Sequence, residues 1–297
     1  MKIGIFTSFG WSIERVFRDI EKHIPEHIFH YLEWSSYNYD QLMDFIQNSD
    51  IIITTSYVSV CGFPDFKYFP IQRVLFIAHG AGETDGHTFS NDFIYGLASR
   101  HLTPLFPNNV TFLTPNGVDP TLFQYTERNG IINKIGWCGN PQVPLKQIEW
   151  GIEIGKQTNT EFNICSKVPC EDDISKWQGI LFHEVVNWYQ TIDMLLVTSI
   201  PKETTETGPL PAFEAIVSGV PVIGTPVGNF STIPGPKFKT IEEGVEIVNR
   251  LKQNPEEVKQ LAKEQYEYVM KHYTYESMIH LWKEAVEYVY LNIMKAV

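Results

Sequence analysis

Residues 206–225, with the sequence ETGPLPAFEAIVSGVPVIGT, constrain the fold of this chain more than any other stretch. A loop with Gly208 and Pro209 leads into a helix predicted over residues 211–218, and Gly219 follows its end. Pro just inside a helix and Gly just past it are the usual boundary residues. The apolar run VPVIGT then predicts a short buried strand. A loop, a helix and a buried strand in this order are typical of a parallel sheet covered by helices.

The rest of the chain repeats this alternation of strands and helices. In the first part the apolar patterns predict strands over residues 2–7, 28–32, 50–55, 73–78 and 110–114, and helices over 12–22, 39–47 and 90–102. Later patterns predict strands over 134–138, 161–165, 179–184 and 193–199, and helices over 145–156, 187–191, 241–252, 255–272 and 275–295. Such alternation indicates an α/β fold with doubly wound parallel sheets, which bind ligands at the carboxyl ends of their strands.

A polar stretch without periodicity, residues 126–130, follows the turn signal Pro115-Asn116-Gly117 and suggests a domain boundary there. We expect an N-terminal domain over residues 1–118 and a C-terminal domain over residues 119–274, each Rossmann-like. A chain of 297 residues is long enough for two such domains.

Composition limits the partners and the compartment. The formal net charge of −12 argues against general nucleic-acid binding, which needs clustered Lys and Arg. Cys61, Cys138, Cys165 and Cys170 lack metal-ligand spacing, so we expect free thiols in a reducing, cytoplasmic compartment. The N-terminus is predicted to be a first strand rather than a signal peptide, and no apolar run reaches the roughly 20 residues of a membrane span.

Glu206 and Glu214 have seven residues between them and flank the start of the predicted helix. The first N–H groups of a helix lack helical partners and carry the positive end of its dipole, so they stabilise a phosphate. Carboxylates beside that phosphate are expected to face sugar hydroxyls. Taken alone, two acids at this spacing are more typical of a solvated surface loop.

Glu206 and Glu214, followed by Ala215, Gly219, Pro221 and the strand Val222-Ile223, resemble the signature of the retaining nucleotide-sugar glycosyltransferases of family 4. The phrase PNGVD, residues 115–119, is similar to the passage between the two domains of that family. The resemblance implies the GT-B fold: two Rossmann-like domains face each other across a cleft, and the last helix, residues 275–297, crosses back to the N-terminal domain.

The resemblance also assigns roles to residues of the C-terminal domain. Glu206 corresponds to the acid that holds the donor sugar, and Glu214 to the acid that binds the ribose. The backbone N–H groups of Gly208 and Leu210 are expected to face sugar or phosphate, whereas Pro209 has none. Val185, with Val186, falls where the family places the base, ahead of the helix predicted over 187–191; apolar residues there are also typical of core.

The loop over residues 136–146, GWCGNPQVPLK, resembles the family's diphosphate loop. Lys146 matches the family's Lys in spacing, and Gly139 precedes Asn140, which stands where the family has Arg. Asn donates hydrogen bonds but brings neither a charge nor a bidentate fork. A solvated Lys at a helix start is the plain alternative for Lys146, although the dipole disfavours a cation there.

In the N-terminal domain the resemblance points to His79, which ends the strand predicted over residues 73–78, as a partner of the donor sugar. A lone His at a strand end is more often structural, but the Gly-rich loop of residues 79–88 leaves room for a ligand. Asp85 and His87 of that loop are candidates for orienting the acceptor. Gly10, between Phe9 and Trp11, is expected to line the cleft.

The resemblance implies a retaining hexosyltransferase that moves a sugar from a UDP- or GDP-linked donor to a hydroxyl of a carbohydrate, lipid or protein. No cofactor and no metal are expected, because no Asp-x-Asp triplet follows a strand and Asp172-Asp173 lies in a polar stretch. Two alternatives stay open: a non-catalytic nucleotide-sugar binding module and a GT-B nucleotide-sugar epimerase. The location expected is cytoplasmic or peripheral to a membrane, and the sequence leaves the oligomeric state undetermined.

Overall fold

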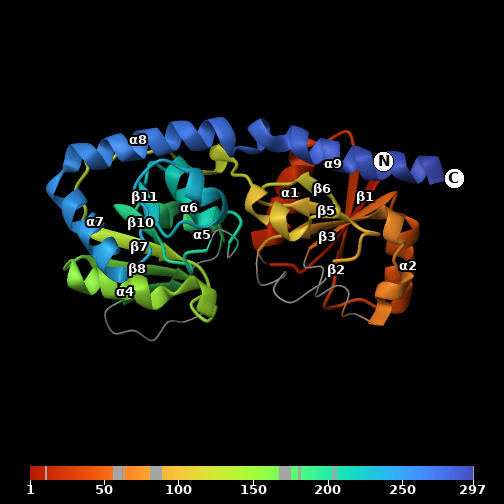
Figure 1. The fold of residues 1–297 in the computed structure, drawn as a ribbon, viewed down its shortest axis with the longest axis horizontal. Helices are drawn as coiled ribbons and strands as arrows, with labels where there is room; N and C mark the ends of the chain where they lie inside the picture. Colours follow the sequence, from red (N-terminus) through yellow and green to blue (C-terminus); the bar gives the residue numbers. More distant parts are fainter. Residues whose placement is uncertain are drawn as a thin grey trace. The chain divides into compact units, whose positions relative to one another are not determined.

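The computed structural model divides into two compact units, residues Met1–Gly117 with Tyr275–Val297 and residues Val118–Thr274 (Figure 1). It describes residues 1–10, 12–55, 62, 64–80, 89–166, 175–179, 182–202, 204 and 206–296. Within these ranges the side chains of residues 175–179, 182–183 and 294–296 are not described. Outside the described residues lie Trp11, Cys61, Asp85, His87, Cys170, Asp172 and Asp173.

The first unit is built on a six-stranded sheet in the order β2-β1-β3-β4-β5-β6, in which every pair of neighbours is parallel. Its strands are β1 (Lys2–Thr7), β2 (Ile28–Glu33), β3 (Ile51–Thr55), β4 (Val74–Ala78), β5 (Ile94–Leu97) and β6 (Val110–Leu113). Its helices are α1 (Ser12–His23), α2 (Tyr39–Gln47), η1 (Pro64–Tyr68), η2 (Ile71–Arg73), η4 (Arg100–Leu105) and α9 (Tyr275–Ala296). Each crossover needs a covering segment because parallel neighbours cannot be joined by a tight turn.

The second unit has a five-stranded parallel sheet in the order β11-β10-β7-β8-β9. Its strands are β7 (Lys134–Cys138), β8 (Glu161–Ser166), β9 (Ser175–Gly179), β10 (Met194–Val197) and β11 (Val222–Gly224). Its helices are η5 (Pro120–Leu122), η6 (Pro144–Lys146), α4 (Ile148–Gln157), α5 (Phe182–Tyr189), α6 (Leu210–Val217), η7 (Gly228–Thr232), α7 (Ile241–Gln253) and α8 (Pro255–His272). In this sheet β7 lies at the centre, flanked by β10 and β8.

Each unit has its own core. In the first unit, aromatic rings from several strands pack together, with Phe76 and Phe93 at 4.9 Å between ring centroids and Tyr95 and Phe106 also at 4.9 Å. Helix α9 closes this unit: Trp282 is fully buried and its indole N–H donates to the Pro115 carbonyl at 3.0 Å. The core of the second unit is mainly aliphatic, with Trp137, Phe162 and Phe238 among its buried side chains.

Three sequence predictions of secondary structure differ from the structure: the helix over residues 90–102, the strand over 179–184 and the helix over 187–191. Residues 90–102 form strand β5 followed by the start of η4 rather than one helix. Tyr95 and Gly96 of β5 pair with β4 and β6, and a Cβ at Gly96 would lie 2.5 Å from the side chains of Ile77 and Thr114. The closely packed sheet therefore requires glycine at that position.

The segment that ends at Tyr189 also differs from its prediction. The strand predicted over 179–184 instead ends at Gly179 as β9, and helix α5 spans Phe182–Tyr189 rather than residues 187–191. Val185, expected ahead of a helix, therefore lies inside one, and its side chain is 8% exposed. His183, which the sequence suggests is structural, has a side chain outside the described ones.

Candidate functional site

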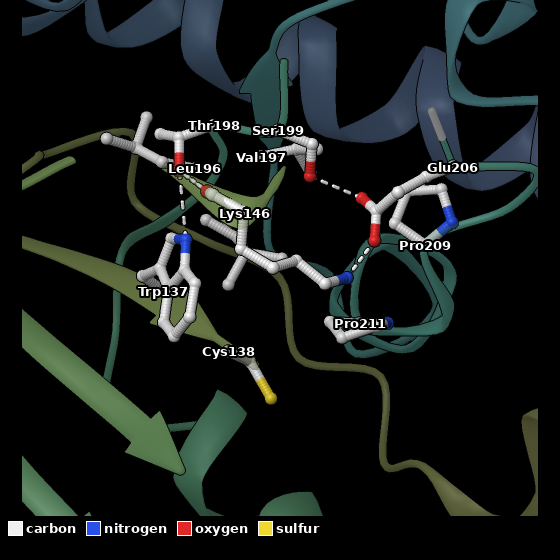
Figure 2. Close-up of a pocket in the computed structure, with 11 residues that line it drawn as sticks. Trp137, Cys138, Lys146, Leu196, Val197, Thr198, Ser199, Glu206, Pro209 and Pro211 are labelled. Carbon is white, nitrogen blue, oxygen red and sulfur yellow. Dashed lines mark hydrogen bonds and ion pairs between the residues drawn. The ribbon is translucent and has the colours of Figure 1, made fainter. Parts of the chain in front are cut away.

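One pocket of the second unit gathers side chains from the start of the motif of residues 206–225, from η6 and from the central strands β7 and β10 with the residues that follow β10 (Figure 2). Cys138 ends β7, Lys146 ends η6, and Thr198 and Ser199 follow β10. The lining also includes Glu206 and two prolines at the start of α6, Pro209 and Pro211. The pocket therefore lies at the carboxyl edge of the parallel sheet, where doubly wound folds bind their ligands.

Lys146 and Glu206, which are 60 residues apart in the chain, form an ion pair in this pocket (Figure 2). The Lys146 ammonium contacts Oε1 of Glu206, while the hydroxyl of Ser199 donates to Oε2 at 2.5 Å. Both carboxylate oxygens are thus held, one by a cation and one by a neutral donor. The Lys146 and Glu206 side chains are 26% and 15% exposed, so the pair is only partly open to solvent.

Burial sets the charge of the Lys146 amine. Desolvation lowers the pKa of Lys146 from its ordinary value of 10.5 to about 8. The amine is therefore mostly protonated at pH 7, but a small rise in pH discharges it. Such a cation, desolvated and held by a single carboxylate, is suited to exchange that carboxylate for an incoming anion.

The backbone of Lys146 is fixed by the segment that leaves β10. Thr198 Oγ1 donates to the Lys146 carbonyl at 2.8 Å and accepts from the indole N–H of Trp137 at 3.0 Å. The Ile200 N–H donates to the Leu145 carbonyl at 2.9 Å. The backbone of Gln147 is left-handed, with φ of 42°, so η6 ends at Lys146 before α4 begins. Lys146 therefore lies in a short turn and not in the first turn of α4.

Gly139 and Asn140 form the turn that precedes η6, and neither lines the pocket. The side-chain oxygen of Asn140 accepts from the Gln142 N–H at 2.9 Å, and the Asn140 carbonyl accepts from the Val143 N–H at 3.2 Å. The Gly139 N–H donates to the Cys165 carbonyl at 3.1 Å. Asn140 thus closes a turn with its side-chain oxygen, which a family-type Arg at this position has no means to do.

The start of α6 offers few N–H donors. Pro209 is the residue before the helix, Pro211 is its second residue, and neither carries an N–H. The Ala212 N–H donates to the Pro209 carbonyl at 2.8 Å. Leu210, the first residue of α6 and two residues after Gly208, is 7% exposed. The expected anion site at this end is therefore poorer in donors than an ordinary helix N-terminus, and Lys146 carries more of the positive charge.

Glu214 lies in α6 with 3% of its surface exposed, and it does not line the pocket that contains Glu206. Its Oε2 accepts from the Tyr189 hydroxyl at 2.8 Å, a bond between α6 and α5. Burial, together with the Glu214 carboxylate, raises the pKa of Tyr189 well above its ordinary value, so the phenol stays a donor. The two acids of the motif are therefore held by different partners, Glu206 by Lys146 and Ser199 and Glu214 by Tyr189.

His79 and Gly10 belong to the first unit, whereas the pocket is in the second. His79 is partly buried directly after β4, and desolvation lowers its pKa to about 4, so its ring is neutral at pH 7. Gly10 has φ of 75° and donates its N–H to Glu14 at 2.8 Å. The Gly-rich loop after Gly80, residues 81–88, lies outside the described residues.

Three pocket residues, Ser199, Thr198 and Trp137, and the partner of Glu214, Tyr189, were not predicted from the sequence. Their contacts join segments that are distant in sequence, except that Ser199 is seven residues before Glu206. For Ser199 a signal was present: a hydroxyl follows directly on a buried strand at the ligand-binding edge. The other three have no local spacing that marks them.

Residues 154–284 match a family model described as "Glycosyl transferase-like". No match was found among curated proteins. The chain is similar in structure to Anabaena Alr3699/HepE in complex with UDP and glucose, with a TM-score of 0.75, 14% identity, and coverage of 97% of this chain and 99% of that one.

Two further solved structures are similar over nearly the whole chain. A glycosyltransferase from Rickettsia africae has a TM-score of 0.71 and 13% identity, covering 97% of this chain and 98% of its own. A DNA-modifying beta-glucosyltransferase has a TM-score of 0.62 and 12% identity, covering 97% of this chain and 100% of its own. At such low identity these likenesses establish the fold.

The predicted fold class is thereby confirmed, with parallel sheets in two units that match GT-B structures along their length. The resemblance to glycosyltransferases that the motif of residues 206–225 indicates is supported by the family match across that motif. Among the helices of the described chain, none combines the length and apolar character needed to cross a bilayer. The chain thus has the GT-B fold, and its residues 154–284 resemble glycosyltransferases through their match to the "Glycosyl transferase-like" family model.

Proposed function

We propose that this protein is a retaining glycosyltransferase that moves a sugar from a UDP- or GDP-linked donor to an acceptor hydroxyl without a metal ion. The observation that carries the proposal is the Lys146–Glu206 ion pair at the carboxyl edge of the second sheet. A cation and a carboxylate side by side match the two chemistries of a nucleotide sugar, its diphosphate and its hydroxyls. The UDP-glucose complex of the structurally similar HepE supports a UDP-linked donor in particular.

Donor binding then works by exchange of partners. The diphosphate takes the ammonium of Lys146, and Glu206 is released from the ion pair to accept hydrogen bonds from sugar hydroxyls. In the transfer, the bond from the anomeric carbon to the leaving phosphate oxygen breaks, and the acceptor oxygen bonds to that carbon on the same face. The acceptor proton passes to the departing phosphate. Stabilising the diphosphate is the main task of the site, and Lys146 supplies the charge.

The remaining roles belong to the same proposal. Glu214, held by Tyr189, binds the ribose, and His79 acts on the donor sugar as a neutral hydrogen-bonding ring. The acceptor is a carbohydrate, a lipid or a protein, and the net charge of −12 disfavours DNA. The partly exposed Cys138 and the buried Cys165 are free thiols, which suits a reducing, cytoplasmic location.

A non-catalytic nucleotide-sugar binding module is the second candidate. It is favoured by the turn-closing role of Asn140 and by Pro209 and Pro211, which together reduce the donors available to the leaving diphosphate. A panel of UDP-, GDP- and ADP-linked sugars separates the two. Donor hydrolysis or transfer, with the anomeric configuration of the product read by NMR, supports the retaining enzyme. Binding of a donor without turnover, across a panel of acceptors, supports the module, and an epimerised donor identifies an epimerase.

Glu206→Ala tests the assignment within the site. We expect loss of transfer, because the sugar loses its carboxylate, whereas UDP alone binds at least as tightly as to the wild type, since Lys146 loses its competing anion. Lys146→Ala is expected to weaken the binding of both UDP and the nucleotide sugar. The control is Glu246→Ala, an exposed acid on α7. If Glu206→Ala is folded, as shown by a cooperative thermal unfolding transition, and transfers sugar as fast as the wild type, the assignment of Glu206 to the donor site is wrong.

A further inference from the structure

The side chain of Ser199 contacts the carboxylate oxygen of Glu206 that Lys146 does not contact (Figure 2). Ser199 is 2% exposed and donates to Glu206 Oε2 at 2.5 Å. Its own carbonyl accepts from the hydroxyl of Thr225 at 2.5 Å, which ties the segment after β10 to the residue that follows β11. The backbone that carries the Ser199 hydroxyl is therefore held in place by Thr225, and this position directs the hydroxyl toward Glu206.

We propose that Ser199 is a positioning residue that keeps Glu206 in the pocket when the nucleotide sugar draws Lys146 away. This inference rests on the proposed function. Among the described residues, Lys146 contacts Oε1 of Glu206 and Ser199 donates to Oε2. Once Lys146 binds the diphosphate, Oε1 becomes the acceptor for a sugar hydroxyl and Ser199 still holds Oε2. A single oxygen of Glu206 is thus presented to the sugar, in a direction that Ser199 determines.

The surroundings of Glu206 support this role. Glu206 lies in a loop before α6 and not within a helix, so its position depends on tertiary contacts. The backbone of the next residue, Thr207, is held from one side by η7, where the Asn229 N–H donates to the Thr207 carbonyl at 2.8 Å. Within the described part of the chain, Lys146 and Ser199 hold the carboxylate on the pocket side, and Ser199 is the neutral partner of the two, without a charge that a diphosphate would attract.

The test compares UDP with UDP-glucose in four proteins: wild type, Ser199→Ala, Glu206→Ala and the double variant. Affinities are measured by calorimetry and kcat and KM for the donor by a transfer or donor-hydrolysis assay. Loss of a hydrogen bond to a charged group is expected to lower kcat/KM for UDP-glucose about 10- to 100-fold, while the Kd of UDP changes by less than about twofold. In the Glu206→Ala background, Ser199→Ala is expected to have no further effect on UDP-glucose affinity.

Two matched variants separate positioning from structure. Ser199→Thr keeps the hydroxyl and is expected to restore most of the UDP-glucose affinity. Thr158→Ala removes another buried hydroxyl of the same unit, which donates to the Ile154 carbonyl at 2.8 Å, and should leave the donor constants unchanged at a similar cost in stability.

The outcomes distinguish this inference from the function on which it rests. If Ser199→Ala weakens UDP and UDP-glucose equally, or adds its full effect to that of Glu206→Ala, Ser199 supports the fold rather than Glu206 and the inference is wrong. The inference is also wrong if the wild type is active and Ser199→Ala has the same kcat/KM and affinity for UDP-glucose. If the wild type itself binds no UDP-, GDP- or ADP-sugar, the proposed function fails, and the inference fails with it.

Discussion

The proposed chemistry depends most on Lys146, and the pKa of its amine allows this dependence to be tested. Burial lowers this pKa to about 8, so the ammonium is largely formed at pH 7 and lost at pH 9. The charge of a nucleotide sugar's diphosphate is constant over this range. We therefore predict that the affinity for UDP-glucose is highest below pH 8 and falls about tenfold for each unit above it, measured by calorimetry from pH 6.5 to 9.5.

Lys146→Arg is the matched control for this pH dependence. A guanidinium stays protonated throughout the range, so the variant should bind UDP-glucose with little change in affinity between pH 7 and 9. A wild type whose affinity is flat in pH, or an Arg variant that loses affinity as the wild type does, would place the titrating group elsewhere. His79 does not compete with this interpretation, because its pKa of about 4 lies below the range tested.

At the residue scale, the sequence predicted the members of the motif better than their neighbours. Lys146 and Glu206 follow from spacing and turn residues, and the structure brings the two together. The fixed partners of the site, Ser199 and Thr198, directly follow β10, and Tyr189 lies in α5. Their roles depend on which strands are neighbours in the sheet, and β10 lies beside β7 only because of a crossover that no local pattern encodes.

At the scale of elements, η7 positions the loop that carries Glu206. Gly228 begins η7 with φ of 39°, and a Cβ there would lie 2.0 Å from the Glu206 carbonyl and 2.5 Å from the Thr207 carbonyl. Backbone atoms cannot yield as a flexible side chain does. The close approach of η7 to this loop is therefore possible only with glycine at position 228.

Gly228→Ala is predicted to shift the Glu206 loop and to weaken UDP-glucose binding strongly, with a loss of unfolding free energy of about 1–3 kcal/mol. Calorimetry and thermal unfolding measure the two effects. Gly219→Ala is the control, because its φ is 82° and its Cβ would lie 2.2 Å from the Thr126 carbonyl, a comparable clash against another segment. Equal loss of donor affinity in both variants at matched stability would contradict a specific role for η7.

Elements with strong apolar periodicity or clear boundary residues were predicted within a few residues, as for α2, α8 and β7. The failures lie where tertiary pairing decides. The run FIYGL of residues 93–97 is short and apolar, which suits a buried helix as well as a buried strand, and its place between β4 and β6 makes it a strand. For α5 the sequence misplaced the boundaries, because no clear capping residue or glycine marks them.

At the scale of the whole molecule, the two units have separate cores, so a ligand of one unit should stabilise that unit first. The pocket with Lys146 and Glu206 lies wholly within the second unit. Binding to a folded state stabilises it by RT ln(1 + [L]/Kd), which is about 2.7 kcal/mol at a ligand concentration of about 100 times Kd. Hydrogen exchange reports such stabilisation segment by segment.

We therefore predict that UDP, without a sugar, slows amide exchange in peptides from residues 136–146 and 206–217, and up to about 100-fold where exchange requires unfolding of the second unit. Peptides covering β1 and β2 in the first unit should exchange at nearly the rate of the free protein, because every residue that lines the pocket belongs to the second unit. Lys146→Met, measured at the same UDP concentration, should show much weaker protection. Protection centred on β1 and β2 would instead place the nucleotide on the first unit, and with it the diphosphate that Lys146 is proposed to bind.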